Sequence, residues 1–537
     1  MSGSSSSPTP SSSSRPSGTP TPGHRSVRDK LKGWEFHAIA ILGIAMLAFG
    51  WLVVKRSALQ NERKTDLDVF LRAAWAVRAN EDIYATFSER GWNYVYPSTF
   101  AILLTPLAEP PTEQTFLKLA ANRQKFGDSR GLSPEETSQE VARFKGEAAR
   151  LNAKLNSDRS FYVPFWISCV IWYLASLVMI LWSAHLLARA VEIVDQRLSD
   201  LHWRDRGWWM LRLWPVIFCA PGLFNGLSRG QSDALVLLCV SGFIYLTVAR
   251  KGRFAMWGGF CLAGAVAVKI IPALLIVYPL WRRDLRSLVG FACGLLLLLI
   301  VIPSIAFGPA QALEYNLQWL RVMGAPGLGN VVSALGQGDT SRKFELYGLS
   351  GTESQSLVAV AHNLAHLTTP RGFRPEDADW WSRPLLIVVG GSMLLITLFA
   401  SGWRSVPAIT SGLRERAAAF LRWPTSADPA APATIALLLC VMLVVTPVCH
   451  THYFAFALPI VVWLVSRGVR EHPHQALSGL GWLLGFAYLT AHALPRLPGL
   501  QILQDTGVMM FTGIAVFLLA AKLLRQARNI ERQSMTL

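Results

Sequence analysis

The feature that most constrains this chain is its series of apolar stretches, which are separated by short segments rich in arginine and lysine. The first stretch runs from Trp34 to Val54, and about 20 apolar residues suffice to cross a bilayer as a helix. In hydrocarbon every backbone N–H and C=O group must be paired within the protein, and a helix achieves this within one segment. The sequence therefore predicts an all-α polytopic membrane protein with about twelve transmembrane helices. These helices are expected to begin near residues 34, 161, 209, 232, 254, 270, 287, 384, 432, 453, 475 and 506.

The distribution of charge distinguishes this chain from a nucleic-acid-binding protein. It has 537 residues, of which 52% are hydrophobic and 16% charged, and a formal net charge of +17. The basic residues lie between the apolar stretches and not along one polar segment, so no nucleic-acid partner is expected. With the N-terminus inside, nearly all basic loops face the cytoplasm, although the loop from Lys55 to Lys64 is an exception. We expect a multi-pass protein of the inner (plasma) membrane with both termini in the cytoplasm.

This topology divides the chain into two tails, a membrane domain and two long loops. The expected ranges are a disordered Ser/Pro-rich cytoplasmic tail at 1–33, a membrane domain at 34–525, a cytoplasmic tail at 526–537, and extracytoplasmic loops at 55–160 and 308–383. In the first loop, residues 109–160 resemble an insertion, and Ser133 followed by Pro134 predicts the start of a soluble helix. Long loops are uncommon unless they are functional, so we expect the function to face outward.

Short apolar segments indicate an internal cavity. The stretch from Arg253 to Asp284 must cross the membrane twice within its length, and it turns at Val268–Lys269 with Pro272 just beyond. Helices this short cannot face lipid throughout. They are expected to lie inside the bundle and to line a cavity.

Polar residues gather at four places that this topology puts on the outer side. Ionisable groups at membrane depth are candidates for function. The first place follows the first transmembrane helix, the second is the turn NGLSRGQSDA, the third is the break between the short helices, and the fourth is TPVCHTHY. The candidate residues there are Asp66 and Asp68; Asn225, Arg229 and Gln231; Lys269; and His450, His452 and Tyr453, with Tyr96 on the first loop.

Each candidate also has a purely structural interpretation. Asp66 could only cap the following helix, and Lys269 could extend to the interface as an anchor. The two histidines could be satisfied interfacial groups, and RGQSDA could be a tight turn anchored by Arg229. Asp66 and Asp68 do not suggest a metal site, because residues two apart on a helix point away from each other. The sequence CHTH has no second ligand cluster at zinc spacing, so no metal and no cofactor are expected.

Together these groups suit transfer of a sugar. A carboxylate can take a proton from an attacking hydroxyl, a histidine can assist it, and a cation can hold the phosphate of a leaving group. Abundant Trp and Tyr suit sugar stacking, although Trp is also enriched at any bilayer interface.

Four stretches carry a resemblance to a known family. The sequence resembles the GT-C glycosyltransferases that use polyprenyl-phosphate sugars, and in particular glycosyltransferase family 87, which includes mycobacterial α-1,2-mannosyltransferases of phosphatidylinositol mannoside synthesis. The stretches are DLDVFLRAAWAVRANEDIYA with YVYPSTFAILLTPLA, NGLSRGQSDALVLLCVSGFIYL, GGFCLAGAVAVKIIPALLIVYPLWRRD and TPVCHTHYFAFALPIVVW. Their common order extends the resemblance over most of residues 34–525.

The resemblance implies roles for individual residues. Asp66 falls on the expected catalytic base, and Asp68 ranks second because relatives vary there. Lys269 falls on a lysine that meets the donor phosphate, with Arg229 and Gln231 nearby, and His452 falls on a histidine expected to assist the base. The implied enzyme has a GT-C fold and moves a hexose, mannose first, from polyprenyl phosphate to an extracytoplasmic lipid or glycan acceptor. The reaction would proceed with inversion and without a metal.

Two features leave alternatives open. The chain reads YPS at Tyr96-Pro97-Ser98 where the family usually reads YPP, and the 109–160 and 337–380 segments are longer than expected. These departures leave the identity of the acceptor and of the sugar open, so a GT-C transferase with a pentose or glucose donor is a second enzymatic interpretation. A lipid-linked sugar flippase is the alternative from another class, although the two halves of the chain show no clear repeat.

Overall fold

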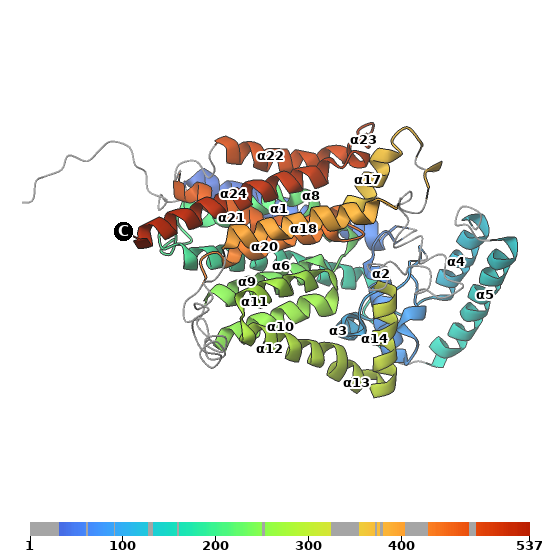
Figure 1. The fold of residues 1–537 in the computed structure, drawn as a ribbon. Helices are drawn as coiled ribbons and strands as arrows, with labels where there is room; N and C mark the ends of the chain where they lie inside the picture. The colour runs from blue at the N-terminus through green and yellow to red at the C-terminus, as the bar shows by residue number, and fades with distance from the viewer. Residues whose placement is uncertain are drawn as a thin grey trace, which may run out of the picture.

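The computed structural model describes residues 32–60, 63–90, 92–126, 133–157, 161–249, 253–323, 354–370, 373–375, 380–402, 428–471 and 479–536. Across these ranges the ordered elements are helices, and the one pairing of strand type is an isolated bridge between Phe87 and Asn93. The predicted all-α class is therefore confirmed. Most helices run alongside one another in a bundle, and a smaller group of helices lies at one end of it (Figure 1). The predicted N-terminal tail lies outside the described residues, except for its last two positions.

Several helices have the length and composition of membrane spans. Six described segments qualify, and a seventh is formed by α7 and α8 if their 67° bend lies within one span. The six are α1 (Gly33–Ala58), α6 (Phe165–Val194), the α12–α13 segment (Leu285–Phe307), α18 (Ser382–Ser401), η8 with most of α21 (Thr451–Arg470) and the first part of α24 (Val508–Ile530). The bent pair is α7 (Arg206–Phe218) and α8 (Ala220–Arg229). The chain is thus a multi-pass membrane protein, and the total of about twelve crossings stays a prediction.

Shorter apolar helices fill the interior. Every residue of α20 (Ala431–Val445) except the last is buried, which is the pattern of a helix surrounded by others. The other short apolar helices are α9 (Asp233–Ala249), α10 (Arg253–Val268) and η4 with α11 (Ile271–Ile276 and Val277–Arg282). The helical path breaks at Lys269, where the sequence predicted the turn.

Helix α10 packs closely against α12 (Leu285–Leu295) through two glycines. A Cβ on Gly259 would lie 1.9 Å from the carbonyl oxygen of Ser287, and one on Gly290 would lie 1.9 Å from that of Met256. Only glycine leaves room for backbones at this separation. The first half of α10 is therefore held in backbone contact with α12.

A π-helical turn connects the α12 span to the smaller group of helices. The turn covers Leu296–Val301 and continues as α13 (Ile302–Phe307), after which Gly308 leads into α14 (Pro309–Met323). Its altered bonding leaves carbonyl groups for other donors. The Thr99 hydroxyl, on α3 (Ser98–Leu103), donates to Leu298, and the Asn316 amide, on α14, donates to Leu299 at 2.5 Å.

The first long loop contains most of the smaller group. Its elements are α2 (Leu67–Ala79), η1 (Ile83–Ala85), α3, η2 (Thr105–Leu107), α4 (Glu113–Phe126) and α5 (Pro134–Ser157). The helix predicted to start at Pro134 is confirmed as α5. It packs on α4 through a small separate core of Leu119, Ala120 and Phe144. Figure 1 shows this pair standing apart from the bundle.

The remaining helices close the bundle. They are α17 (Leu357–Ala365), α21 (Leu458–Glu471), α22 (Gly479–Ala493), η9 (Leu494–Arg496), α23 (Ile502–Asp505) and α24, whose full range is Val508–Thr536. The chain just before α17 pairs with the segment before η8: the Gln355 N–H donates to the Cys449 carbonyl at 2.6 Å, and the Cys449 N–H donates to the Ser354 hydroxyl at 3.1 Å. The described end of the second long loop is thereby tied to the histidine segment.

Candidate active site

The site is built where the N-terminus of α2 meets the turn between α8 and α9. The Asp66 N–H and the Thr65 hydroxyl both donate to the Arg229 carbonyl, at 2.8 and 2.9 Å. Gly230 has a φ of +65°, and a Cβ there would lie 2.7 Å from the Thr65 hydroxyl. Glycine at this turn lets α2 approach, which places Asp66 next to Gln231.

Asp66 occupies the N-cap position of α2, but its side chain makes no capping hydrogen bond. It accepts instead from the Gln231 amide nitrogen, while the Gln231 amide oxygen accepts from the Tyr96 hydroxyl at 3.2 Å. The interpretation of Asp66 as a cap alone is therefore wrong. Burial raises the pKa of the Asp66 carboxyl, and the nearby cations Arg229 and Lys269 oppose that rise. Asp66 as a whole residue is partly exposed, whereas Asp68 and Asp233 are buried.

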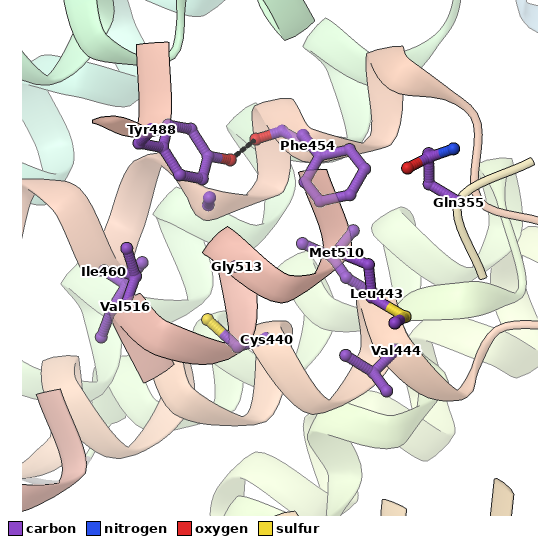
Figure 2. A pocket seen from close by; sticks show the side chains of 11 residues that line it. Gln355, Cys440, Leu443, Val444, Phe454, Ile460, Tyr488, Met510, Gly513 and Val516 are labelled. Carbon is purple, nitrogen blue, oxygen red and sulfur yellow. Dashed lines mark hydrogen bonds between the residues drawn. The ribbon is translucent and has the colours of Figure 1, made fainter. Parts of the chain in front are cut away.

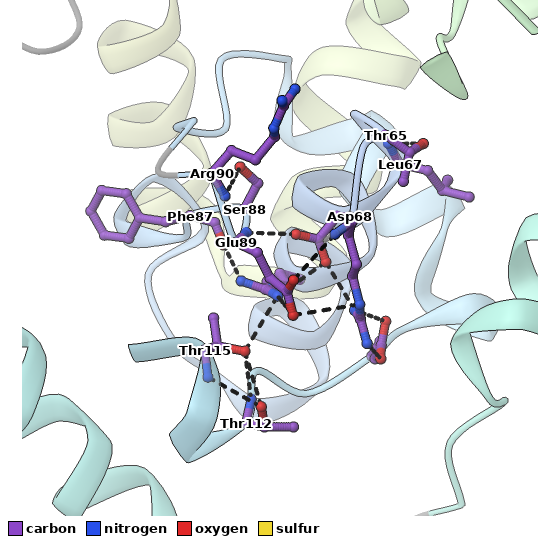
Figure 3. A network of polar contacts seen from close by, with 12 residues as sticks. Thr65, Leu67, Asp68, Phe87, Ser88, Glu89, Arg90, Thr112 and Thr115 are labelled. Atoms are coloured by element: carbon purple, nitrogen blue, oxygen red, sulfur yellow. Dashed lines mark hydrogen bonds and ion pairs between the residues drawn. The ribbon is translucent and has the colours of Figure 1, made fainter. Parts of the chain in front are cut away.

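Asp68 points to a different cluster, as its spacing from Asp66 predicted. It is fully buried and bonds to Arg63 at 2.9 Å and to Arg72 at 3.1 Å, and it accepts the Glu89 N–H at 2.7 Å. Arg63 also pairs with Glu109 at 2.7 Å. Figure 3 shows this network between α2, the loop around Ser88 and the start of α4. Both oxygens of Asp68 are engaged in fixing the loop.

Lys269 is buried at the break after α10 and pairs with an aspartate that sequence reasoning did not select. Its ammonium lies 2.5 Å from Asp233, the first residue of α9. It also lies 4.4 Å from the centre of the Tyr453 ring, within cation–π range. The interpretation of Lys269 as an interfacial anchor is wrong, since its side chain is only 6% exposed. The sequence did contain a signal for this pair: Asp233 and Lys269 lie on two apolar segments that have few other charged residues, so each is a candidate partner for the other.

The histidine segment contributes two further rings near Asp233, those of His450 and His452. It begins η8 (Thr451–Ala457), which packs against α8 so closely that a Cβ on Gly222 would lie 2.9 Å from the Ala455 nitrogen. His452 Nε2 is 3.7 Å from the second oxygen of Asp233, and the rings of His450 and His452 are 5.6 Å apart. Burial, together with the charges of Arg229 and Lys269, lowers the pKa of His450 to about 4. His450 is therefore neutral near pH 7.

The structure brings most of the predicted site residues into one cluster. Asn225 lies in α8 one turn before Arg229, and its backbone carbonyl accepts a hydrogen bond from the Ser228 hydroxyl at 3.0 Å. Within the described ranges, no three His, Cys, Asp or Glu side chains are grouped as metal ligands would be. The residues that do gather are Asp66, Tyr96, Arg229, Gln231, Asp233, Lys269, His450, His452 and Tyr453.

A separate pocket lies deeper in the bundle and has a different character. Figure 2 shows it between η8, α20, α22 and α24, with the Tyr488 hydroxyl donating to the Phe454 carbonyl at 3.1 Å. Its lining is almost entirely apolar and includes Cys440, Met510 and Val516. Such a lining offers no acid, base or cation for chemistry, so the polar cluster is the candidate site.

The fold and site define a multi-pass helical membrane protein with carboxylates, cations and histidines gathered beside its first long loop. The model of glycosyltransferase family 87 matches residues 160–447, more than half of the chain, and the protein belongs to glycosyltransferase family 87. It is a membrane glycosyltransferase. The match includes Gln231, Asp233 and Lys269, whereas Asp66 and His452 lie outside it. No curated protein and no solved structure matches the chain.

Proposed function

We propose that the protein transfers a hexose, with mannose as the first candidate, from a polyprenyl-phosphate donor to a lipid or glycan acceptor on the extracytoplasmic side. The proposal includes a GT-C fold of about twelve crossings, an inner (plasma) membrane location and cytoplasmic termini. The family supports glycosyl transfer, and the site supports the choice of an anionic donor. The observation that carries the proposal is the carboxyl group of Asp66, a partly exposed residue that lies near the cations Arg229 and Lys269.

Asp66 is the general base of this reaction. A base works best when its pKa lies close to the working pH, and burial moves the Asp66 carboxyl in that direction. Asp233 is less suited, because one of its oxygens is 2.5 Å from Lys269 and its side chain is only 4% exposed. Asp68 is less suited still, because both its oxygens are bonded inside the loop network. We assign Asp68 to anchoring α2.

Lys269 and Arg229 bind the donor phosphate. The acceptor hydroxyl attacks the anomeric carbon as the bond from that carbon to the phosphate oxygen breaks, and the hydroxyl proton passes to Asp66. The donor phosphodiester carries one negative charge, and the released polyprenyl phosphate carries two. Fixed cations at that position stabilise the charge that develops in the transition state, so the step needs no metal.

The other members of the cluster shape the cavity. Gln231 orients the Asp66 carboxylate, and the rings of Tyr96 and Tyr453 lie beside Lys269 where a sugar can stack. His452 assists the base and His450, being neutral, can accept a hydrogen bond from a sugar hydroxyl. Asn225 borders the cavity one turn before Arg229.

The test is transfer by the purified full-length protein in liposomes, with radiolabelled polyprenyl-phosphate mannose and a panel of lipid and glycan acceptors. Wild type should release polyprenyl phosphate and form an inverted glycoside, while Asp66→Asn should still bind donor but not turn it over. Polyprenyl-phosphate glucose and pentose donors in parallel test the choice of sugar. Donor that is bound and moved across the bilayer without cleavage, for every sugar and acceptor, would overturn the proposal in favour of a flippase.

A further inference from the structure

The Asp233–Lys269 pair joins two helices that do not need it in order to pack. Helices α9 and α10 already meet through small residues, since a Cβ on Gly242 would lie 3.2 Å from the Cys261 sulfur and one on Gly264 would lie 3.4 Å from that of Cys239. Removing two charges from water is costly, and apolar residues of similar volume often hold a fold equally well. A buried pair at this junction is therefore weak evidence for stability and invites a functional explanation.

Only one of the two carboxylate oxygens of Asp233 has a hydrogen bond among the described residues. Its Oδ1 atom bonds to the Lys269 ammonium at 2.5 Å, whereas Oδ2 is buried without a hydrogen-bond partner among the described residues. The Nε2 atom of His452 lies 3.7 Å from Asp233 Oδ2, and His452 Nδ1 also lacks a hydrogen-bond partner in the described part of the chain. Buried polar atoms without a hydrogen-bond partner are rare in native proteins, and a catalytic role or a bound water or ion is a common explanation for them.

We infer that Asp233 is the positioning residue that keeps the Lys269 ammonium protonated and aimed at the donor phosphate. The inference rests on the proposed function, because it specifies how that site holds its anionic ligand. An ammonium has three N–H groups: Asp233 takes one of them, the Tyr453 side chain also has a hydrogen bond with the ammonium, and one N–H is left for a ligand. The aromatic rings of Tyr453 and Tyr96 lie 4.4 and 5.9 Å from the ammonium, and the bond to Asp233 is its one contact with a carboxylate among the described residues.

The contact between Asp233 and the Lys269 ammonium also favours the charged form of this buried lysine. Burial favours the neutral amine, and an opposite charge at hydrogen-bond distance favours the ammonium. Without Asp233, the two tyrosine side chains and the Asp66 carboxylate provide weaker compensation, and the Arg229 cation opposes protonation of the amine. The titratable and charged groups that face Lys269 come from α2, the chain before α3, α8, α9 and the histidine segment. They are Asp66, Tyr96, Arg229, Asp233, Cys449, His450, His452 and Tyr453.

The experiment compares Asp233→Asn and Asp233→Glu with wild type over a pH series from about 6 to about 9. Two quantities are measured on the full-length protein: binding of farnesyl phosphate, and the donor KM and kcat of transfer. Asp233→Asn should bind the phosphate at least about tenfold more weakly at the alkaline end and recover on acidification, because a buried amine without a counter-charge loses its proton early. Asp233→Glu, which keeps the charge, should restore most of the binding.

A matched variant separates positioning from folding. Asp505→Asn removes the carboxylate of another buried pair, with Arg374 at 3.1 Å, outside the site. It should leave the pH dependence of phosphate binding unchanged. If Asp233→Asn behaves like Asp505→Asn, or loses binding equally at all pH values, the inference is overturned. If farnesyl phosphate binds with the expected pH dependence but no sugar is ever transferred, the proposed function fails and the role of Asp233 stands.

Discussion

Asp66 and Asp68 are two carboxylates two residues apart, yet they belong to opposite kinds of environment. Asp68 is fully buried and bonded to two arginines and a backbone N–H. Asp66 is partly exposed, takes a hydrogen bond from Gln231, and has a raised pKa. A helix turns by roughly 200° over two residues, so neighbours at this spacing face opposite sides. One short helix start can therefore be anchored on one side and remain reactive on the other.

The sharpest test of this contrast is Asp66→Asn. The amide keeps the shape but cannot accept a proton, and loss of a general base typically costs about 10²–10⁴-fold in rate. We expect kcat to fall by that factor while the donor affinity and the unfolding temperature stay close to wild type. Initial rates at saturating donor, with thermal unfolding in the same detergent, measure both. An Asp66→Asn variant with wild-type kcat would exclude Asp66 as the base.

Asp68→Asn should have the converse effect. Removing one partner of a buried ion pair leaves the other charge uncompensated and costs about 3–5 kcal/mol. Here the buried Arg72 would keep only a contact of 4.0 Å with Glu89, whereas Arg63 would keep Glu109 at 2.7 Å. We expect a large loss of stability with little change in kcat per folded molecule. Denaturation curves and active-site titration separate the two, and a stable but inactive variant would place Asp68 in the chemistry.

The sequence predicted the features that depend on local properties, and it missed the contacts that depend on distant partners. Helix content, the break at Lys269 and the soluble helix at Pro134 follow from hydropathy and capping, which are local properties. Asp66, Lys269 and His452 were selected because ionisable groups at membrane depth are costly. Asp233 was missed because its significance depends on a partner 36 residues away. The Asp68 network was missed for the same reason, since its partners come from three separate parts of the loop.

Lys269→Met tests the cation that faces the reactive side. A hydrogen bond to a charged group contributes about 1.5–3 kcal/mol, which corresponds to roughly 10–150-fold in affinity. We expect farnesyl phosphate binding and kcat/KM for the donor to fall within that range. Uncharged farnesol, which lacks the phosphate, should bind wild type and variant equally. Equal loss for both ligands would mean that Met disturbs the cavity and that the ammonium does not hold the phosphate.

Gly230→Ala tests the contact that brings Asp66 into the site. Alanine at a φ of +65° is strained by about 1–2 kcal/mol, and its Cβ would press on the Thr65 hydroxyl at 2.7 Å. Because Thr65 precedes Asp66, we expect kcat to fall in addition to the loss of stability. Gly499→Ala is the control: Gly499 has a φ of +84° with nothing within 4 Å of its Cβ position, so it adds strain without contact. If both variants keep the wild-type kcat, the approach of α2 to this turn does not limit catalysis.

The smallest expected effect is a shift in the pH profile caused by Gln231→Leu. The Gln231 amide donates to the ionised Asp66 carboxylate, which favours the charged form and holds down a pKa that burial raises. Without that bond the pKa rises further, so the acid limb of kcat/KM should move to higher pH while the plateau above it changes little. Tyr96→Phe removes the other hydrogen bond of Gln231 and leaves the bond to Asp66 in place, so its acid limb should stay near that of wild type. Replacing Gln231 by leucine removes a hydrogen-bond donor and adds none, so it cannot stabilise the Asp66 carboxylate. A shift of the acid limb to lower pH in Gln231→Leu would therefore mean that the group titrating in that limb is not Asp66.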